Sequence, residues 1–117
     1  MSVFVYIDDE EMLCRVFGRV IRSLGVPVKT FTDPHLALEY IGHNDVLAVI
    51  CDYRMPRLHG LDVLARIERD VPFILVSGDL VGEDVIAAHP RLTKVLAKPF
   101  KPEELIEVLR PLVPLAN

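Results

Sequence analysis

The sequence predicts an α/β fold in which a five-stranded parallel sheet is covered by helices on both faces. Two observations support this prediction: five short strand-like segments alternate with segments of helical spacing, and the first of them, residues 3–7, lacks the polar alternation of a half-exposed strand. Regular alternation of strand and helix indicates parallel strands joined by right-handed crossovers. The 117 residues suffice for one core but not two, so we expect a single domain over residues 1–117.

The first strand is predicted at residues 3–7, where every side chain is apolar or aromatic. An acidic run, Asp8-Asp9-Glu10-Glu11, follows it. Apolar residues at helical spacing then predict a helix over residues 13–24. Gly25 stands where a helix commonly closes with a residue in the left-handed conformation.

The second strand is predicted at residues 26–31 and the next helix at residues 34–42. Asp33 is expected to cap this helix, with Pro34 at its first position. The third strand is predicted at residues 46–51, directly before Asp52.

The second half of the chain repeats the pattern. A helix is predicted after Gly60, over residues 61–67, then a strand at 72–76, a short helix at about 83–89, a strand at 94–97 and a last helix at 102–110. The end of the chain is unusually apolar, so these side chains either pack the core or form a partner-facing patch: Leu105, Ile106, Val108, Leu109, Leu112 and Val113.

Composition excludes several classes of protein. The net charge of −4 argues against a nucleic-acid-binding surface. No apolar run is long enough to span a membrane, and the sequence starts with no signal-peptide pattern, so we expect a cytoplasmic protein. Cys14 and Cys51 are too few for a disulfide framework and are expected to be small buried side chains.

Polar side chains follow four of the five predicted strands. The first strand is followed by Asp8 and Asp9, the third by Asp52, the fourth by Ser77 and the fifth by Lys98. Because the carboxyl ends of parallel strands share one edge of the sheet, we expect these groups to converge there.

Three neighbouring carboxylates repel one another, and a hard divalent cation such as Mg²⁺ relieves that repulsion. With Lys98 adding a further positive charge, the site can accept a dianionic group, to which Ser77 can donate a hydrogen bond. This set of groups suits phosphoryl transfer. Asp52 lies between the other groups and is the candidate nucleophile, which would form an aspartyl phosphate.

Four pieces of the sequence, in this order and at these spacings, closely resemble the receiver domain of two-component response regulators. They are Ile7-Asp8-Asp9-Glu10, Asp52-Tyr53-Arg54-Met55-Pro56 with Gly60, Ser77-Gly78 and Lys98-Pro99-Phe100. The resemblance covers the whole chain, and it implies a stand-alone receiver domain over residues 1–117 with no output domain. It implies the three-layer, flavodoxin-like fold of CheY-like proteins, with strand order 2-1-3-4-5 and five helices.

The resemblance also implies roles for the site residues. Asp52 would accept a phosphoryl group from a phosphohistidine of a histidine kinase or phosphotransfer protein. Mg²⁺ would be bound by Asp9, Asp52 and the backbone carbonyl of Arg54, with Asp8 acting through water.

The remaining implied roles concern the phosphoryl group and the signal. Ser77 and Lys98 would contact the phosphoryl oxygens, and the Lys98-Pro99 peptide bond would be cis. Such a domain catalyses only its own phosphorylation and dephosphorylation. It would be a monomer or weak homodimer that binds an effector through its fourth helix, fifth strand and fifth helix.

Two features bear on regulation. Many receivers have an aromatic residue three positions before the lysine that corresponds to Lys98. Here Val95 stands at that position, so the usual ring movement is not available.

Arg54 and Asp79 lie two residues beyond Asp52 and Ser77, at positions that flank the phosphoryl group in this family. Our hypothesis is that they pair across the mouth of the site and slow the approach of water.

Two other functions stay open at this point. The chain could be a degenerate receiver that serves as a protein-interaction scaffold without phosphorylation. It could instead be an enzyme of similar fold, but a flavodoxin needs a Ser/Thr/Gly-rich phosphate loop where this chain is acidic. A haloacid-dehalogenase phosphatase needs an Asp-x-Asp pair on one strand end, and no Walker-type glycine loop is present.

Overall fold

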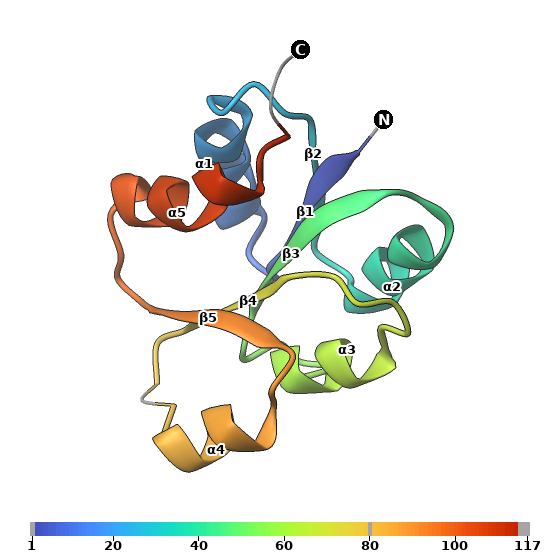
Figure 1. The fold of residues 1–117 in the computed structure, drawn as a ribbon, viewed down its shortest axis with the longest axis vertical. Coiled ribbons are helices and arrows are strands. Elements are labelled where there is room, and N and C mark those ends of the chain that lie inside the picture. The colour runs from blue at the N-terminus through green and yellow to red at the C-terminus, as the bar shows by residue number, and fades with distance from the viewer. Residues whose placement is uncertain (1, 80, 115–117) are drawn as a thin grey trace.

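The computed structural model describes residues 2–79 and 81–114, and its strands form one parallel sheet in the order β2-β1-β3-β4-β5 (Figure 1). The strands are β1 (Val3–Ile7), β2 (Val28–Phe31), β3 (Val46–Asp52), β4 (Phe73–Ser77) and β5 (Leu92–Ala97). The helices are α1 (Glu11–Arg22), α2 (Pro34–His43), α3 (Gly60–Arg66), α4 (Glu83–Ala88) and α5 (Pro102–Leu109), followed by a 3-10 turn, η1 (Arg110–Leu112). The predicted fold class and strand order are confirmed.

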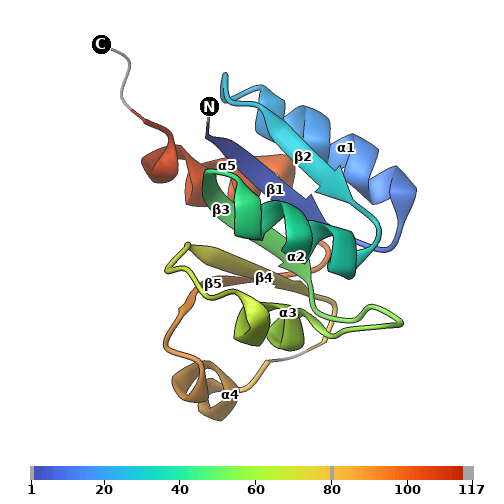
Figure 2. The same ribbon diagram turned by 90° about the vertical axis from the view of Figure 1, so that its right-hand side faces the viewer.

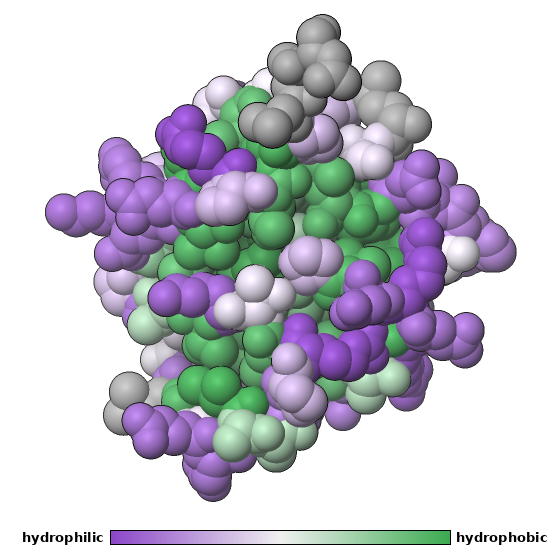
Figure 3. Space-filling view, in the orientation of Figure 1, coloured by the Kyte–Doolittle hydropathy of each residue, from purple (hydrophilic) through white to green (hydrophobic). Residues whose placement is uncertain are grey.

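The sheet is the middle of three layers. Helices α1 and α5 cover one face, and α2 and α3 cover the other (Figures 1 and 2). Successive side chains of β1 point to opposite faces, so Phe4 and Tyr6 join the core beneath α1 and α5, while Val5 and Ile7 join the core beneath α2 and α3. Figure 3 shows hydrophobic residues gathered in the middle of the view, with hydrophilic residues mainly around the rim.

Two predicted local signals are found, although α1 spans Glu11–Arg22 rather than residues 13–24. Gly25 has a φ of +82°, in the left-handed region where an L side chain is strained, and its N–H donates to the carbonyl of Arg22 after α1. The side chain of Asp33 accepts the backbone N–H of His35 at 2.9 Å, which caps α2 with Pro34 at its start.

Strands β3 and β4 differ from their predicted ranges by one residue, and two other strands begin two residues from their predicted starts. Strand β2 begins at Val28 rather than residue 26, because Pro27 has no N–H to donate, although its carbonyl accepts the N–H of Phe4 at 3.0 Å. Strand β5 begins at Leu92 rather than residue 94, because a register shift in the β4–β5 pairing extends it. Beside that shift, the Thr93 hydroxyl accepts the N–H of Phe73 at 3.2 Å.

The end of the chain also differs from the prediction. Helix α5 stops at Leu109, and the chain tightens into η1, because Pro111 cannot continue the α-helical hydrogen bonds. The apolar residues of this segment mostly serve the core: Leu105 and Leu109 are fully buried, and Val108, Leu112 and Val113 pack against the same cluster. The core therefore accounts for most of this apolar surface.

Within the described ranges 2–79 and 81–114, no helix is both long and apolar enough to cross a membrane. The two cysteine side chains are buried free thiols, as predicted. Burial raises the pKa of Cys14 to about 11 and that of Cys51 well above its usual range, so both stay protonated near neutral pH.

Candidate functional site

The register of the sheet brings the predicted groups to one edge. Strand β1 pairs with β3 through Ile7 and Cys51, so Asp8 and Asp52 are the next residues along these two strands. Strand β4 pairs with β5 through Ser77 and Ala97, so Lys98 follows at the same edge. The N–H of Lys98 donates to the carbonyl of Ser77 at 2.8 Å, which extends this pairing to the site itself.

Three carboxylates cluster at this edge. Oxygens of Asp8, Asp9 and Asp52 lie within 4.8 Å of one another. Asp8 is 0% and Asp52 is 8% exposed, whereas Asp9 is open to solvent. Negative charges at this separation, partly removed from water, repel one another unless a cation lies among them.

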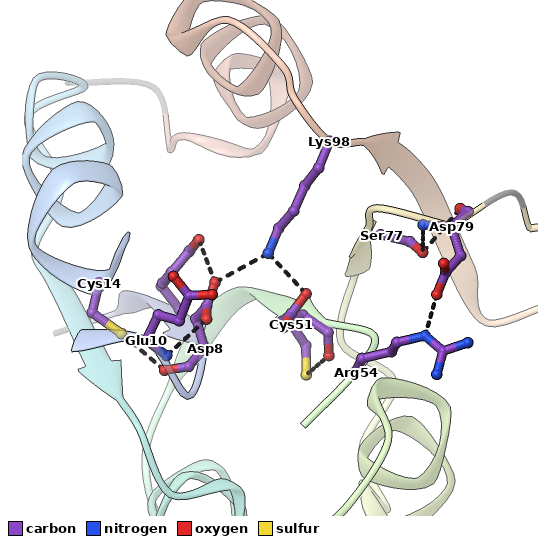
Figure 4. Close-up of polar contacts among 10 residues, drawn as sticks. Asp8, Glu10, Cys14, Cys51, Arg54, Ser77, Asp79 and Lys98 are labelled. Carbon is purple, nitrogen blue, oxygen red and sulfur yellow. Dashed lines mark hydrogen bonds and ion pairs between the residues drawn. The ribbon is translucent and has the colours of Figure 1, made fainter. Parts of the chain in front are cut away.

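Lys98 is the ammonium that reaches the cluster. Its Nζ lies 3.0 Å from Oδ1 of Asp52 and 3.6 Å from Oδ2 of Asp8 (Figure 4). One ammonium against three carboxylates leaves the cluster with excess negative charge. The donor set and this excess fit a hard divalent cation with oxygen ligands.

The pKa values of the pair follow from these contacts. Burial raises the pKa of Asp52 above its usual range, and the neighbouring charges of Asp8 and Asp9 add to the rise. The hydrogen bond and charge of Lys98 oppose it. Burial on its own would lower the pKa of Lys98, but the hydrogen bond to Asp52 and the charges of Asp8 and Asp52 outweigh it, so the net shift is upward and Lys98 stays charged.

Ser77 reaches the edge, but its hydroxyl faces its own loop. The Oγ accepts the backbone N–H of Asp79 and donates to the Asp79 carbonyl, both at 3.0 Å. These are the two hydrogen bonds found for this hydroxyl in the described structure, so the sequence prediction placed Ser77 on the correct edge but not its rotamer. A Cβ added at Gly78 would meet no atom within 4 Å, so the backbone beside Ser77 is open.

The loop after β3 is shaped by a close approach at Gly60. A Cβ at this position would lie 2.7 Å from the carbonyl oxygen of Asp52 and 2.6 Å from Cδ1 of Leu75. The Gly60 N–H donates to the carbonyl of Tyr53 at 2.8 Å. The start of α3 thus packs directly against the backbone of Asp52, and only glycine leaves room for this contact.

The predicted pairing of Arg54 with Asp79 is confirmed: the guanidinium Nε donates to the Asp79 carboxylate across the mouth of the site (Figure 4). The metal contact assigned to the Arg54 carbonyl stays a prediction. The Lys98-Pro99 peptide bond is cis, as the family resemblance implied.

Two contacts near the site were not predicted from the sequence. The Tyr6 hydroxyl donates to Oδ2 of Asp8 at 3.3 Å; the signal for it was the spacing of two residues, which puts both side chains on one face of the chain. Arg57 pairs with Asp33 at 3.0 Å and so joins the β3–α3 loop to the start of α2. A hollow of about 380 Å³ lies beside this pair, lined by Asp9, Thr32, Asp33, Pro34, Met55, Pro56 and Arg57.

Val95 is half-buried on β5 and packs against the core beneath α2 and α3. A branched aliphatic side chain in this position has no ring to turn between a buried and an exposed orientation.

Comparisons with known proteins found related sequences and structures of similar fold. The family model of the response regulator receiver domain matches residues 4–110. The response regulator protein TmoT of Ectopseudomonas mendocina is 31% identical over 119 residues, which cover 98% of this chain and 54% of TmoT. The chain spans about half the length of the curated relatives that it matches.

Two solved structures have the same fold. The crystal structure of an uncharacterised protein from Neptuniibacter caesariensis has 28% identity and a TM-score of 0.85, with 95% of this chain and 85% of that chain covered. The receiver domain of sensor histidine kinase PA1611 from Pseudomonas aeruginosa PAO1 has 25% identity and a TM-score of 0.79, with 94% of each chain covered. In that crystal structure a magnesium ion is coordinated in the active site cleft.

Proposed function

The chain belongs to the response regulator receiver domain family, and on that basis we propose that Asp52 is the phosphoacceptor of a two-component or phosphorelay pathway. The observation that carries this proposal is the position of Asp52. It is a nearly buried carboxylate within 4.8 Å of two other acids, and its Oδ1 lies 3.0 Å from the Lys98 ammonium.

The proposed reaction is a transfer from phosphohistidine to carboxylate. An oxygen of Asp52 attacks the phosphorus atom, a P–O bond forms and the P–N bond to the donor imidazole breaks. The imidazole leaves with the electron pair and takes up a proton from solvent. Because this chemistry depends on position and charge compensation, the protein's main task is to hold Asp52 and neutralise the incoming dianion.

The acid cluster fits Mg²⁺. Asp9, Asp52 and the backbone carbonyl of Arg54 would hold the ion, and Asp8 would act through water. When bound, Mg²⁺ supplies charge neutralisation for the phosphoryl oxygens. Asp9 is exposed and Asp8 is fully buried, with hydrogen bonds to both of its oxygens, which supports a direct role for Asp9 and an indirect one for Asp8.

Lys98 and Ser77 would contact the phosphoryl group once it is on Asp52. Lys98 already lies against the carboxylate that would carry it. The Ser77 hydroxyl would have to exchange its two bonds with the Asp79 backbone for a bond to a phosphoryl oxygen. That exchange would change the conformation of the β4–α4 loop on phosphorylation. It would do so without the ring movement of other receivers, which Val95 cannot make.

The partners follow from the family role. The donor would be a histidine kinase or a histidine phosphotransfer protein, and the phosphorylated state would change binding of an effector at the α4–β5–α5 face. Slow hydrolysis of the acyl phosphate by water would then end the signal. A cytoplasmic location suits both partners.

Intact mass spectrometry tests the proposal against the alternative of an unphosphorylated scaffold. Wild-type protein incubated with acetyl phosphate and Mg²⁺ should gain the mass of one phosphoryl group. Asp52→Asn should gain none, and a chelator should abolish the gain in wild type. A wild-type protein that stays unmodified, or an Asp52→Asn variant that is modified equally, would support the scaffold instead.

A further inference from the structure

Tyr6 has a polar contact that the core does not require. Its side chain is 1% exposed, and its ring packs in the core beneath α1 and α5. Strand side chains two residues apart point to the same face, so the Tyr6 hydroxyl lies next to the carboxylate of Asp8, 3.3 Å from Oδ2. A phenylalanine would fill the same core volume without this bond.

Each carboxylate oxygen of Asp8 accepts a hydrogen bond. Oδ1 of Asp8 accepts the backbone N–H of Glu10 at 3.0 Å, and Oδ2 accepts the Tyr6 hydroxyl. An ionised carboxylate only accepts hydrogen bonds, so the Tyr6 hydroxyl is the donor in this contact. Both oxygens of the fully buried carboxylate therefore have donors from its own strand or the turn that follows.

These donors affect where Lys98 sits. Its Nζ is 3.6 Å from Oδ2 of Asp8, beyond hydrogen-bond distance, but 3.0 Å from Oδ1 of Asp52. An ammonium between two carboxylates approaches more closely the one with fewer other donors, because that oxygen has more unsatisfied charge. The Tyr6 hydroxyl already donates to Oδ2 of Asp8, so the Lys98 ammonium stays closer to Asp52.

We propose that Tyr6 is a positioning residue for the phosphoacceptor site: its hydroxyl satisfies Oδ2 of Asp8 and thereby keeps Lys98 on Asp52. This inference rests on the proposed function for its effect on phosphorylation, but not for its effect on the position of Lys98. The ring itself is held by Phe17, whose centroid lies 5.8 Å away, and Phe17 packs against Phe100 at 4.8 Å. Removal of the hydroxyl therefore leaves the ring in place.

The variant that tests this is Tyr6→Phe, with Tyr40→Phe as the matched control. Tyr40 lies on α2, where its ring packs against Phe31, and it also loses only a phenol hydroxyl. The first readout is the side-chain ¹⁵N resonance of Lys98 in metal-free, unphosphorylated protein at constant pH. It should shift in Tyr6→Phe, as Nζ moves toward Asp8, and stay at the wild-type position in Tyr40→Phe.

The second readout is the initial rate of modification by acetyl phosphate with Mg²⁺. Tyr6→Phe should be slower than wild type by about three- to tenfold, the range expected for one hydrogen bond to a charged group whose length exceeds the optimum. In an Asp8→Asn background, Tyr6→Phe should cause little further loss, because the hydroxyl acts through the carboxylate.

The outcomes separate the two proposals. An unshifted Lys98 resonance in a folded Tyr6→Phe variant, or an equal loss of rate in both backgrounds, would overturn the positioning role. Absence of any modification of wild type would instead refute the proposed function, and the resonance test would still decide where Lys98 sits.

Discussion

Gly60→Ala tests whether the start of α3 holds the backbone of Asp52 in place. The new Cβ would lie 2.7 Å from the Asp52 carbonyl oxygen, whereas ordinary contact begins at 3.4 Å. One of the two segments must therefore move by about 0.7 Å. The second contact, 2.6 Å to Cδ1 of Leu75, is to the end of a flexible side chain and is more easily relieved.

Overpacking of this kind costs about 1–3 kcal/mol, which corresponds to a drop in Tm of about 4–12 °C for a domain of this size. Thermal unfolding followed by circular dichroism measures the shift. Because the displaced atom belongs to Asp52, the initial rate of phosphorylation should also fall while the variant is still folded.

Gly42→Ala is the matched control. A Cβ at this exposed position on α2 meets no atom within 4 Å, and alanine favours a helix by about 0.5–1 kcal/mol over glycine. This variant should melt at or above the wild-type temperature and react at the wild-type rate. If Gly60→Ala matched it in both measurements, the close approach would not be what positions Asp52.

Three further predictions concern the site. Burial raises the folded-state pKa of Asp52, so its ionisation destabilises the fold as pH rises above the usual pKa of 3.8. Asp52→Asn should therefore have a higher Tm than wild type at neutral pH, and the difference in Tm should disappear in acid. A difference in Tm that does not depend on pH would contradict this. Mg²⁺ should stabilise wild type by about 1.4 kcal/mol at about ten times its Kd, and much less in Asp9→Asn, as measured by thermal unfolding; equal stabilisation of the two proteins would remove Asp9 from the metal site. Arg54→Ala, which breaks the pair with Asp79, should shorten the lifetime of the aspartyl phosphate, and an unchanged lifetime would refute the proposed barrier to water.

The architecture could be predicted from the sequence because its signals are local. Strands β1, β3 and β4 are short, mainly apolar runs. Asp33 and Pro34 mark the start of α2, and Gly25 follows the end of α1, through their own backbone and side-chain chemistry. One wrong boundary, the start of β5, depends on a partner strand, whereas the start of β2 follows from the local chemistry of Pro27. The start of β5 follows from a register shift in its pairing with β4, and no property of residues 92 and 93 alone indicates it.

At the site, too, features that follow from the chain itself were predicted, whereas features that depend on neighbouring side chains were not. Convergence of the acids and Lys98 follows from strand direction, so it was predicted correctly. The orientation of the Ser77 hydroxyl depends on the turn that it forms with Asp79, which sequence spacing does not specify. Tyr6 was missed because a tyrosine in an apolar strand is usually a core residue, and its role depends on which side chain lies next to its hydroxyl.

Chemical mapping of the acyl phosphate shows directly whether Asp52 is the phosphoacceptor. Protein treated with acetyl phosphate and Mg²⁺ is reduced with borohydride, which converts an aspartyl phosphate to homoserine and releases phosphate, and the chain is then digested and sequenced by mass spectrometry. We expect homoserine at position 52 alone, and none when Mg²⁺ is withheld. Homoserine at position 8 or 9, or an unreduced Asp52 in protein that carries a phosphoryl group elsewhere, would contradict it.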